Sequence, residues 1–229
     1  MLYKATVNEL EKVVENKHAI PQELADQKYG HIGGIDYYDG VLYGGIEISK
    51  SEPGVIAAWN ATDLSLLRWE VTAQNGMPWV AADGVAGLLY STHWSDTGRI
   101  NVFDMTTFQQ RDDLTIRPAS EAPADQFPPE IQGAAFYERD PGFLFLAANG
   151  AESVYKVDIA SGALSFVLSD KQYRSHEAEM EGLTFWDLGA RGVMHMFSNF
   201  ERVVQKGLHS YLDMGGSPAP HVPVQVQVE

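Results

Sequence analysis

The chain has 229 residues, of which 45% are hydrophobic and 11% aromatic, enough to bury the core of one all-β domain. The 31 acidic residues against 16 basic ones give a formal net charge of −15, which repels phosphate backbones and argues against nucleic acid as a partner. The sequence contains no cysteine, which excludes disulfides, thiolate metal sites and a cysteine nucleophile.

The N-terminal stretch, residues 1–14, has the pattern of two short strands joined by a turn. No segment reaches the roughly 18 apolar residues of a membrane helix, and the start lacks the positive segment and apolar core of an export signal. We therefore expect a soluble chain without membrane insertion. Its compartment stays open, because a chain trimmed of its leader would begin in the same way.

One short phrase of small and apolar residues recurs four times after this stretch. Taking Gly33, Trp79, Gln132 and Glu181 as equivalent positions, it returns about every 50 residues, which is typical of β-propeller blades. Each copy predicts two inner strands joined at a turn. The copies begin with His31-Ile-Gly-Gly-Ile-Asp, Met77-Pro-Trp-Val-Ala-Ala, Glu130-Ile-Gln-Gly-Ala-Ala and Glu179-Met-Glu-Gly-Leu-Thr.

Two further strands follow each of the first three copies, so the pattern predicts four-stranded antiparallel blades and no substantial helix. The expected third strands are residues 55–59, 99–103 and 153–157, and the expected fourth strands are residues 66–71, 111–116 and 164–168.

The two ends of the chain each supply part of a blade. Residues 181–185, 193–197 and 208–212 predict the first strands of a last blade, and residues 1–14 resemble the second half of one. A closing blade shared between the ends gives four blades, which we prefer; separate partial blades would give five. We expect one propeller domain over residues 1–214, followed by a proline-rich tail or outer strand at 215–229.

Innermost propeller strands line a central channel, so equivalent positions form rings around it. The repeat alignment places at one channel mouth three carboxylates, three amides and two histidines with two tryptophans beside them. These residues are Glu47, Glu179, Glu181, Gln132, Asn149, Asn199, His31, His93, Trp79 and Trp94.

Carboxylate and amide oxygens from several segments are the ligands that Ca²⁺ prefers. Three other interpretations stay open. The polar side chains could satisfy strand ends or bind channel water, the carboxylates could act as an acid–base pair without metal, and the tryptophans could pack between blades. The sequence has no nucleophile elbow, phosphate loop or dinucleotide fingerprint.

The Glu181-Gly182-Leu183 entry into an inner strand, together with Asn149 and Asn199 at the ends of second strands, resembles the calcium-dependent propellers of the gluconolactonase, senescence-marker and paraoxonase superfamily. The resemblance implies a calcium ion at the channel mouth that polarises a lactone or ester carbonyl. It implies Glu181, Asn149 and Asn199 as ligands and Glu179 or His31 as the base. Those propellers usually have six blades, and their aspartate ligand has no counterpart in this sequence. The phrases "HIGGIDYYDG" and "EMEGLTFWDL" are also similar to those of uncharacterised propeller proteins.

Two functional hypotheses follow. The first is a calcium-assisted lactone or ester hydrolase, with Glu179 and His31 as catalytic residues and Glu181, Asn149, Asn199 and Glu47 as metal ligands. The second is a non-catalytic module that binds a glycan, peptide or protein. In both, a small-molecule or carbohydrate ligand would contact Gln132, Trp79, His93 and Trp94 at the mouth, and the oligomeric state is not determined.

Overall fold

The computed structural model describes residues 1–6, 11–119, 126–169, 179–186, 193–200, 206–212 and 224–227, with side chains up to residue 197. These residues form two compact units. Unit 1 comprises Met1–Trp94 and Ile100–Thr115, and unit 2 comprises Ser95–Arg99 and Ile116–Glu229. No helix of the described ranges is long and apolar enough to cross a membrane.

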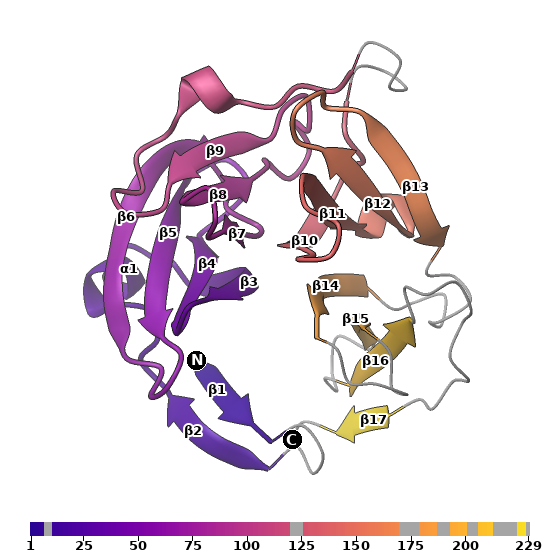
Figure 1. The fold of residues 1–229 in the computed structure, drawn as a ribbon. Coiled ribbons are helices and arrows are strands. Elements are labelled where there is room, and N and C mark those ends of the chain that lie inside the picture. The colour runs from indigo at the N-terminus through magenta and orange to yellow at the C-terminus, as the bar shows by residue number, and fades with distance from the viewer. Residues whose placement is uncertain are drawn as a thin grey trace. The chain divides into compact units, whose positions relative to one another are not determined.

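Unit 1 contains three antiparallel sheets (Figure 1). Strands β1 and β2 pair with each other, β3 to β6 form a four-stranded sheet in chain order, and β7 to β9 form a three-stranded sheet. Two short helices, α1 and η1, complete the unit. The bounds are β1 Leu2–Ala5, β2 Lys12–Asn16, α1 Gln22–Asp26, β3 His31–Tyr38, β4 Val41–Glu47, β5 Pro53–Asn60, β6 Leu66–Asn75, β7 Ala81–Asp83, β8 Leu88–Ser91, β9 Asn101–Asp104 and η1 Asp112–Leu114.

Unit 2 contains two four-stranded antiparallel sheets, β10 to β13 and β14 to β17, each in chain order. In β10 to β13 the sequential order follows from the short connections between strands, which favour pairing of neighbours in sequence. The bounds are β10 Ile131–Phe136, β11 Phe143–Ala148, η3 Asn149–Ala151, β12 Ser153–Asp158, β13 Leu164–Ser169, β14 Glu179–Phe185, β15 Met194–Phe200, β16 Lys206–Leu212 and β17 Val224–Gln227.

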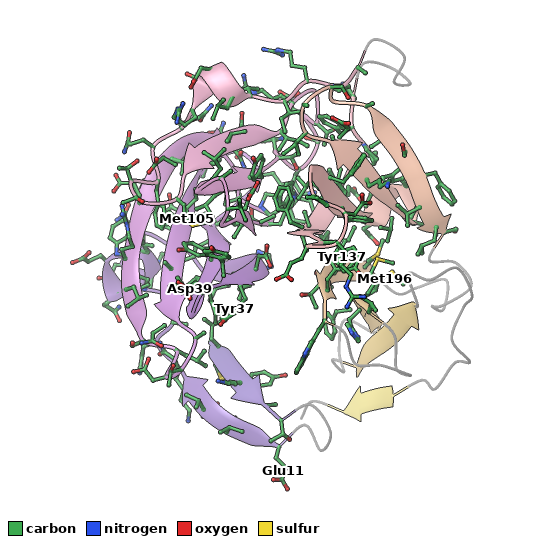
Figure 2. All side chains as sticks on the ribbon, viewed as in Figure 1. Glu11, Tyr37, Asp39, Met105, Tyr137 and Met196 are labelled. Atoms are coloured by element: carbon green, nitrogen blue, oxygen red, sulfur yellow. The ribbon has the colours of Figure 1, made fainter. Side chains whose placement is uncertain are left out.

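Separate apolar cores support the two units. In unit 1, Trp59 is fully buried against α1, and its indole N–H donates to the carbonyl of Ala19 at 2.9 Å. In unit 2, the core between the two sheets includes Met196, with Tyr137 packed against it (Figure 2). Tyr137 in turn stacks on Phe185 with ring centroids 4.6 Å apart. The inner strands are therefore fixed by packing on at least one face.

The turn after the third strand is the same in three sheets. An Asn or Asp begins it, and the residue four positions later has a left-handed backbone: Leu64, Phe108 and Gly162, with φ of 62°, 61° and 73°. In the second of these turns, the Asp104 carboxylate accepts the backbone N–H groups of Thr106 and Thr107 at 3.0 and 2.7 Å. Side-chain capping of this kind lets non-glycine residues adopt the left-handed conformation.

Each inner strand of the four-stranded sheets carries a β-bulge at the position used to align the repeats. In β3, Gly33 and Gly34 oppose Gly45 alone, because Ile32 pairs with Ile46 and Ile35 with Gly44. In β10 and β14 the extra residues are Gln132 and Glu181. A bulge redirects the side chain of the extra residue, so it determines what these strands present at their ends.

The prediction of a fourth strand over residues 111–116 is wrong for the middle of this segment. Asp112–Leu114 forms the 3-10 helix η1, and the bridge between Phe103 and Gln110 is the contact that continues this sheet. Two adjacent aspartates are poor strand formers, and the Arg111 guanidinium binds Asp113 at 2.8 Å within the turn.

The closing blade also differs from the expectation. The third and fourth strands of the last sheet are β16 and β17, from the C-terminal part of the chain, while β1 pairs with β2. The alternating segment Val224–Gln227 after the last proline provides the outer strand, one of the two alternatives for the tail. The remainder of 215–229 lies outside the described residues, and the single domain over 1–214 stays a prediction.

Candidate functional site: two polar clusters at the inner strands

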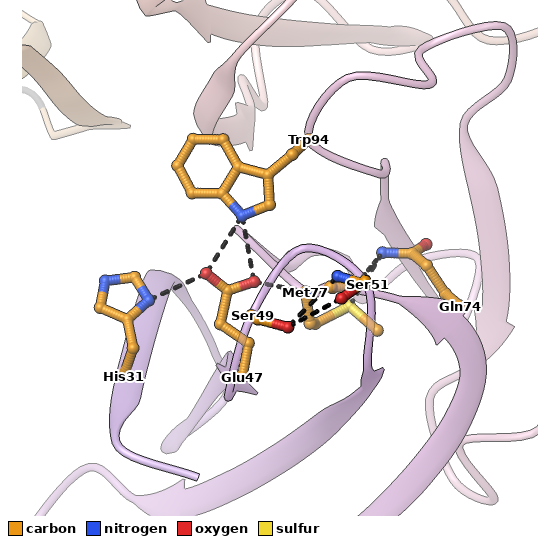
Figure 3. A network of polar contacts seen from close by, with 8 residues as sticks. His31, Glu47, Ser49, Ser51, Gln74, Met77 and Trp94 are labelled. Atoms are coloured by element: carbon orange, nitrogen blue, oxygen red, sulfur yellow. Dashed lines mark hydrogen bonds and ion pairs between the residues drawn. The ribbon is translucent and has the colours of Figure 1, made fainter. Parts of the chain in front are cut away.

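The unit 1 cluster consists of His31, Glu47 and Trp94, together with the backbone N–H of Met77 (Figure 3). Glu47 ends β4 opposite His31, which begins β3. One carboxylate oxygen of Glu47 lies 3.1 Å from Nδ1 of His31, and the other accepts the Met77 N–H at 2.9 Å. The indole N–H of Trp94 lies 3.1 Å from both oxygens. The alignment was right to bring these three side chains together.

Glu47 is held as a carboxylate in this cluster. Its side chain is only 7% exposed, and burial by itself would raise its pKa. The hydrogen bonds from His31, Met77 and Trp94 together outweigh burial, so the pKa of Glu47 lies below its ordinary value. Glu47 is therefore ionised at neutral pH, and its negative charge is compensated by surrounding N–H groups.

The hydrogen-bond partners of Glu47 are not compatible with a role as calcium ligand. N–H donors are directed at both carboxylate oxygens, and they would have to leave before a cation could bind there. Within the described ranges, no group of three or more His, Asp or Glu side chains is placed to hold a metal ion. For Glu47, the geometry supports the interpretation in which a polar side chain accepts hydrogen bonds from N–H groups at the ends of strands.

His93 and Lys50 lie beside the unit 1 cluster. The His93 Nε2 is 2.8 Å from the carbonyl oxygen of Lys50, and the Lys50 ammonium lies 4.4 Å from the centre of the Trp94 ring. Trp94 and His93 are half-buried. Both side chains are therefore partly open to solvent, and the ligand contact expected at them stays a prediction.

Trp79 is not available as an aromatic anchor on the surface. It is fully buried, and its indole N–H donates to the Thr92 hydroxyl at 3.1 Å. The isolated bridge to Gly34 holds its backbone against β3. The expected ligand contact at Trp79 is therefore replaced by packing in unit 1, because the inner strands approach each other closely at this position.

Five of the expected site residues belong to unit 2, and we call them the unit 2 cluster: Gln132, Asn149, Glu179, Glu181 and Asn199. Glu179 pairs with Asn199 across β14 and β15, and Asn149 directly follows β11. The side-chain oxygen of Asn149 accepts the N–H of Met180 at 3.0 Å. The side chain of Asn199 lies outside the described residues.

The two bulges of unit 2 lie side by side. A Cβ atom on Gly133 would lie 2.6 Å from the Cα of Gly182, so β10 and β14 are in backbone contact directly after Gln132 and Glu181. Gln132 is buried and Glu181 half-buried, whereas Glu179 is exposed. The backbones that carry two of these carboxylates and the Gln132 amide are thus neighbours.

Sequence reasoning missed Asp36, which lies in the middle of β3. Its two carboxylate oxygens accept the N–H groups of Ala82 and Tyr37, both at 2.9 Å. Burial outweighs these bonds and raises the pKa of Asp36 to about 6. The sequence signal that could have identified Asp36 is an acidic residue among the small and apolar residues of an expected inner strand.

Asp36 should make the stability of the protein depend on pH. A folded-state pKa above the unfolded value means that the stabilisation is complete below pH 4 and is lost as the pH rises through about 6. Between pH 4.5 and 7.5 the natural protein should lose about 2 kcal/mol relative to Asp36→Asn, measured by denaturant unfolding. Asp113→Asn is the control, since the hydrogen bond from Arg111 lowers the pKa of Asp113. An equal difference at both pH values would contradict the prediction.

No family model matches the chain, and no curated protein matches it in sequence. Solved structures do match it in fold. Hydrazine synthase of Kuenenia stuttgartiensis has a TM-score of 0.52 at 9% identity, over 87% of this chain and 49% of that one. Glutaminyl cyclase of Myxococcus xanthus has a TM-score of 0.52 at 14% identity, over 80% of this chain and 66% of that one. A nidogen/laminin complex has a TM-score of 0.48 at 15% identity, over 78% and 59%.

The chain spans about half to two thirds of the length of these solved chains, which are β-propeller proteins. At identities this low, the likeness concerns the fold alone. The likenesses at a TM-score of 0.52 agree with the repeated antiparallel sheets of units 1 and 2. The chain therefore has the β-propeller fold.

Proposed function

We propose that the chain hydrolyses a small lactone or ester at the unit 2 cluster, with calcium as cofactor. The observation that carries the proposal is the adjacency of the two bulges, so that Gln132 and Glu181 belong to neighbouring backbones. The Asn149 side chain binds the N–H of Met180, the residue before Glu181. Bulges on inner strands are commonly used to direct side chains into functional sites.

The residues of unit 2 fit calcium in their chemistry. Glu181, Asn149 and Asn199 would hold the ion, because carboxylate and amide oxygens are the ligands that calcium prefers. The Asn149 oxygen accepts one hydrogen bond, from Met180, and a carbonyl oxygen has a second lone pair. A bound ion would supply Lewis-acid polarisation of the substrate carbonyl.

The other residues of the cluster have separate roles in this proposal. Glu179 is exposed next to Asn199 and takes the proton from the attacking water. Gln132, buried on the adjacent strand, orients the substrate through its amide. Glu47 is not part of the set, because the N–H groups of unit 1 already satisfy its oxygens.

Calcium titration of chelator-treated protein tests the proposal, with heat and thermal unfolding followed together. We expect saturable binding near one ion per chain and a rise in melting temperature, both lost in Glu181→Ala, followed by lactone or ester turnover that Glu179→Gln lowers at least tenfold. Glu23→Ala, an exposed substitution in α1, is the matched control. The absence of both heat and thermal shift would overturn the calcium site.

The second candidate is the non-catalytic binding module. The half-buried Trp94 favours it, with its ring covered on one side by Lys50 at 4.4 Å, since such aromatic surfaces hold sugars and peptides. In the same experiments, saturable ligand binding without turnover and without sensitivity to chelator would support this candidate over the hydrolase.

A further inference from the structure

Strand β6 has an open edge within the part of the chain that the structure describes. It is the last strand of the β3–β6 sheet and pairs with β5 on one side only (Figure 1). At ten residues it is the longest described strand, and residues 68–71 pair with β5 without interruption, because the bulge precedes Arg68. An open edge of this length leaves backbone N–H and C=O groups in position to pair with another strand.

Apolar side chains lie exposed along this edge. Leu67 and Val71 are 53% and 45% exposed, and Trp69 between them is half-buried at the margin of the unit 1 core. Edge strands are usually protected from pairing by proline, by lysine or by a charge that points inward, whereas exposed apolar side chains favour pairing. The edge of β6 is therefore a surface that another strand can cover.

The two charged residues of β6 have no counter-ion among the described residues. The Arg68 guanidinium donates to the carbonyl oxygens of Thr106 and Thr107. It also lies 4.1 Å from the centre of the Phe108 ring, so the side chain is held in place while its charge stays uncompensated. Glu70, two residues further along, is exposed. The strand thus carries a cation and a carboxylate, and neither has an opposite charge within the described ranges.

The outer strand of unit 2 differs from β6 in both length and charge. Strand β13 has six residues and no charged side chain. Its exposed Phe166 already packs against Tyr155, with the ring centroids 5.9 Å apart. An edge without charges defines the register of a partner strand only weakly, so β6 is the edge to which a specific partner can be assigned.

We propose that β6 pairs with β6 of a second copy of this chain, antiparallel and about a twofold axis at Trp69. In this register Arg68 lies opposite Glu70 of the second copy, and Leu67 lies opposite Val71. Residues directly opposite each other in an antiparallel pair are close enough for ion pairs and apolar contacts. The twofold axis makes each of these contacts occur twice, and the β3–β6 sheets of the two copies become one continuous sheet. This pairing is independent of the calcium site.

The charges of β6 favour a second copy over an unrelated strand. Arg68 and Glu70 flank Trp69 symmetrically, so the edge is complementary to itself when the second copy runs in the opposite direction. A shift of the register by two residues would place Arg68 opposite Arg68, or Glu70 opposite Glu70. Because like charges directly opposite each other are destabilising, the same two residues select both the partner and the register.

Sedimentation equilibrium of charge-reversed variants tests the proposal. We expect the natural protein to form a dimer, and Glu70→Arg and Arg68→Glu each to raise its dissociation constant by about tenfold or more, since like charges then face each other twice. An equimolar mixture of the two variants should restore the dimer, because every arginine again faces a glutamate. Glu23→Arg, an exposed charge reversal in α1, is the matched control and should leave the dimer intact. Circular dichroism of every variant excludes unfolding as the cause of a lost dimer.

Disulfide cross-linking tests the register, because the natural chain has no cysteine. Under mild oxidation, a mixture of Leu67→Cys and Val71→Cys should form a covalent dimer, since opposite residues have Cα atoms within disulfide range. Each variant alone should cross-link much less, because neither residue lies opposite itself.

Three results would overturn the proposal. A natural protein that stays monomeric would leave the edge of β6 to a strand of another protein. A dimer that Glu70→Arg does not weaken would use a different surface. Cross-linking that is equal in the mixture and in the single variants would exclude the register about Trp69.

Discussion

Replacing Gly45 with alanine should lower the free energy of unfolding by about 3 kcal/mol. The new Cβ atom would lie 2.0 Å from the carbonyl oxygen of Met77, which is backbone and cannot rotate away. Gly45 lies opposite the bulge of β3, so relief would require the strand to move away from the segment that supplies the N–H bound by Glu47. Denaturant unfolding followed by circular dichroism measures the loss.

Gly30→Ala is the matched control for this substitution. Gly30 directly precedes β3, and a Cβ atom added there would lie 3.9 Å from the nearest atom, the carbonyl oxygen of Lys28, which is ordinary contact. We expect a change within about 0.5 kcal/mol. Similar losses in both variants would mean that alanine is disfavoured for reasons other than the close approach at Gly45.

Replacing Glu47 with alanine should cost about 3 kcal/mol, the second large effect. The buried Met77 N–H and the half-buried Trp94 indole N–H would lose their acceptor, and a buried donor left unsatisfied costs about 1–3 kcal/mol. Glu47→Gln keeps one carbonyl acceptor and should cost about half as much. Thermal and denaturant unfolding of the three proteins at pH 7 measures the series.

The Glu47 effect should also depend on pH with a definite sign. Because the folded-state pKa of Glu47 is lowered, its contribution is complete above the unfolded carboxyl pKa and is lost as the pH falls through the folded value. The difference between the natural protein and Glu47→Ala should therefore narrow in acid. A difference that widens below pH 4 would be inconsistent with a carboxylate held by N–H donors.

The inner strands could be predicted from sequence because each repeat combines small residues, apolar runs and a turn at a fixed place. The equivalence of Gly33, Gln132 and Glu181 coincides with the bulges, since an extra residue in a strand must be kept in each repeat to preserve the pairing. The prediction of a strand at residues 111–116 was wrong because polar alternation alone does not distinguish a strand from a short 3-10 helix.

The site could be predicted only as a gathering of residue types. His31, Glu47 and Trp94 come together as the alignment predicts, but the direction of their hydrogen bonds depends on register and packing, which composition does not encode. For the same reason Trp79, an aromatic residue in an equivalent position, could not be recognised as fully buried.

Two hydrogen bonds described above connect the end of the second strand of one sheet to the segment that begins the next sheet: Glu47 accepts from Met77, and Asn149 accepts from Met180. The partners are separated by 30 and 31 residues. Closing loops of this length is fast compared with synthesis at roughly 5–20 residues per second, so each connection can form soon after its second partner leaves the ribosome. Within each unit, the sheets can therefore assemble in chain order during translation, each completed sheet providing an acceptor for the next.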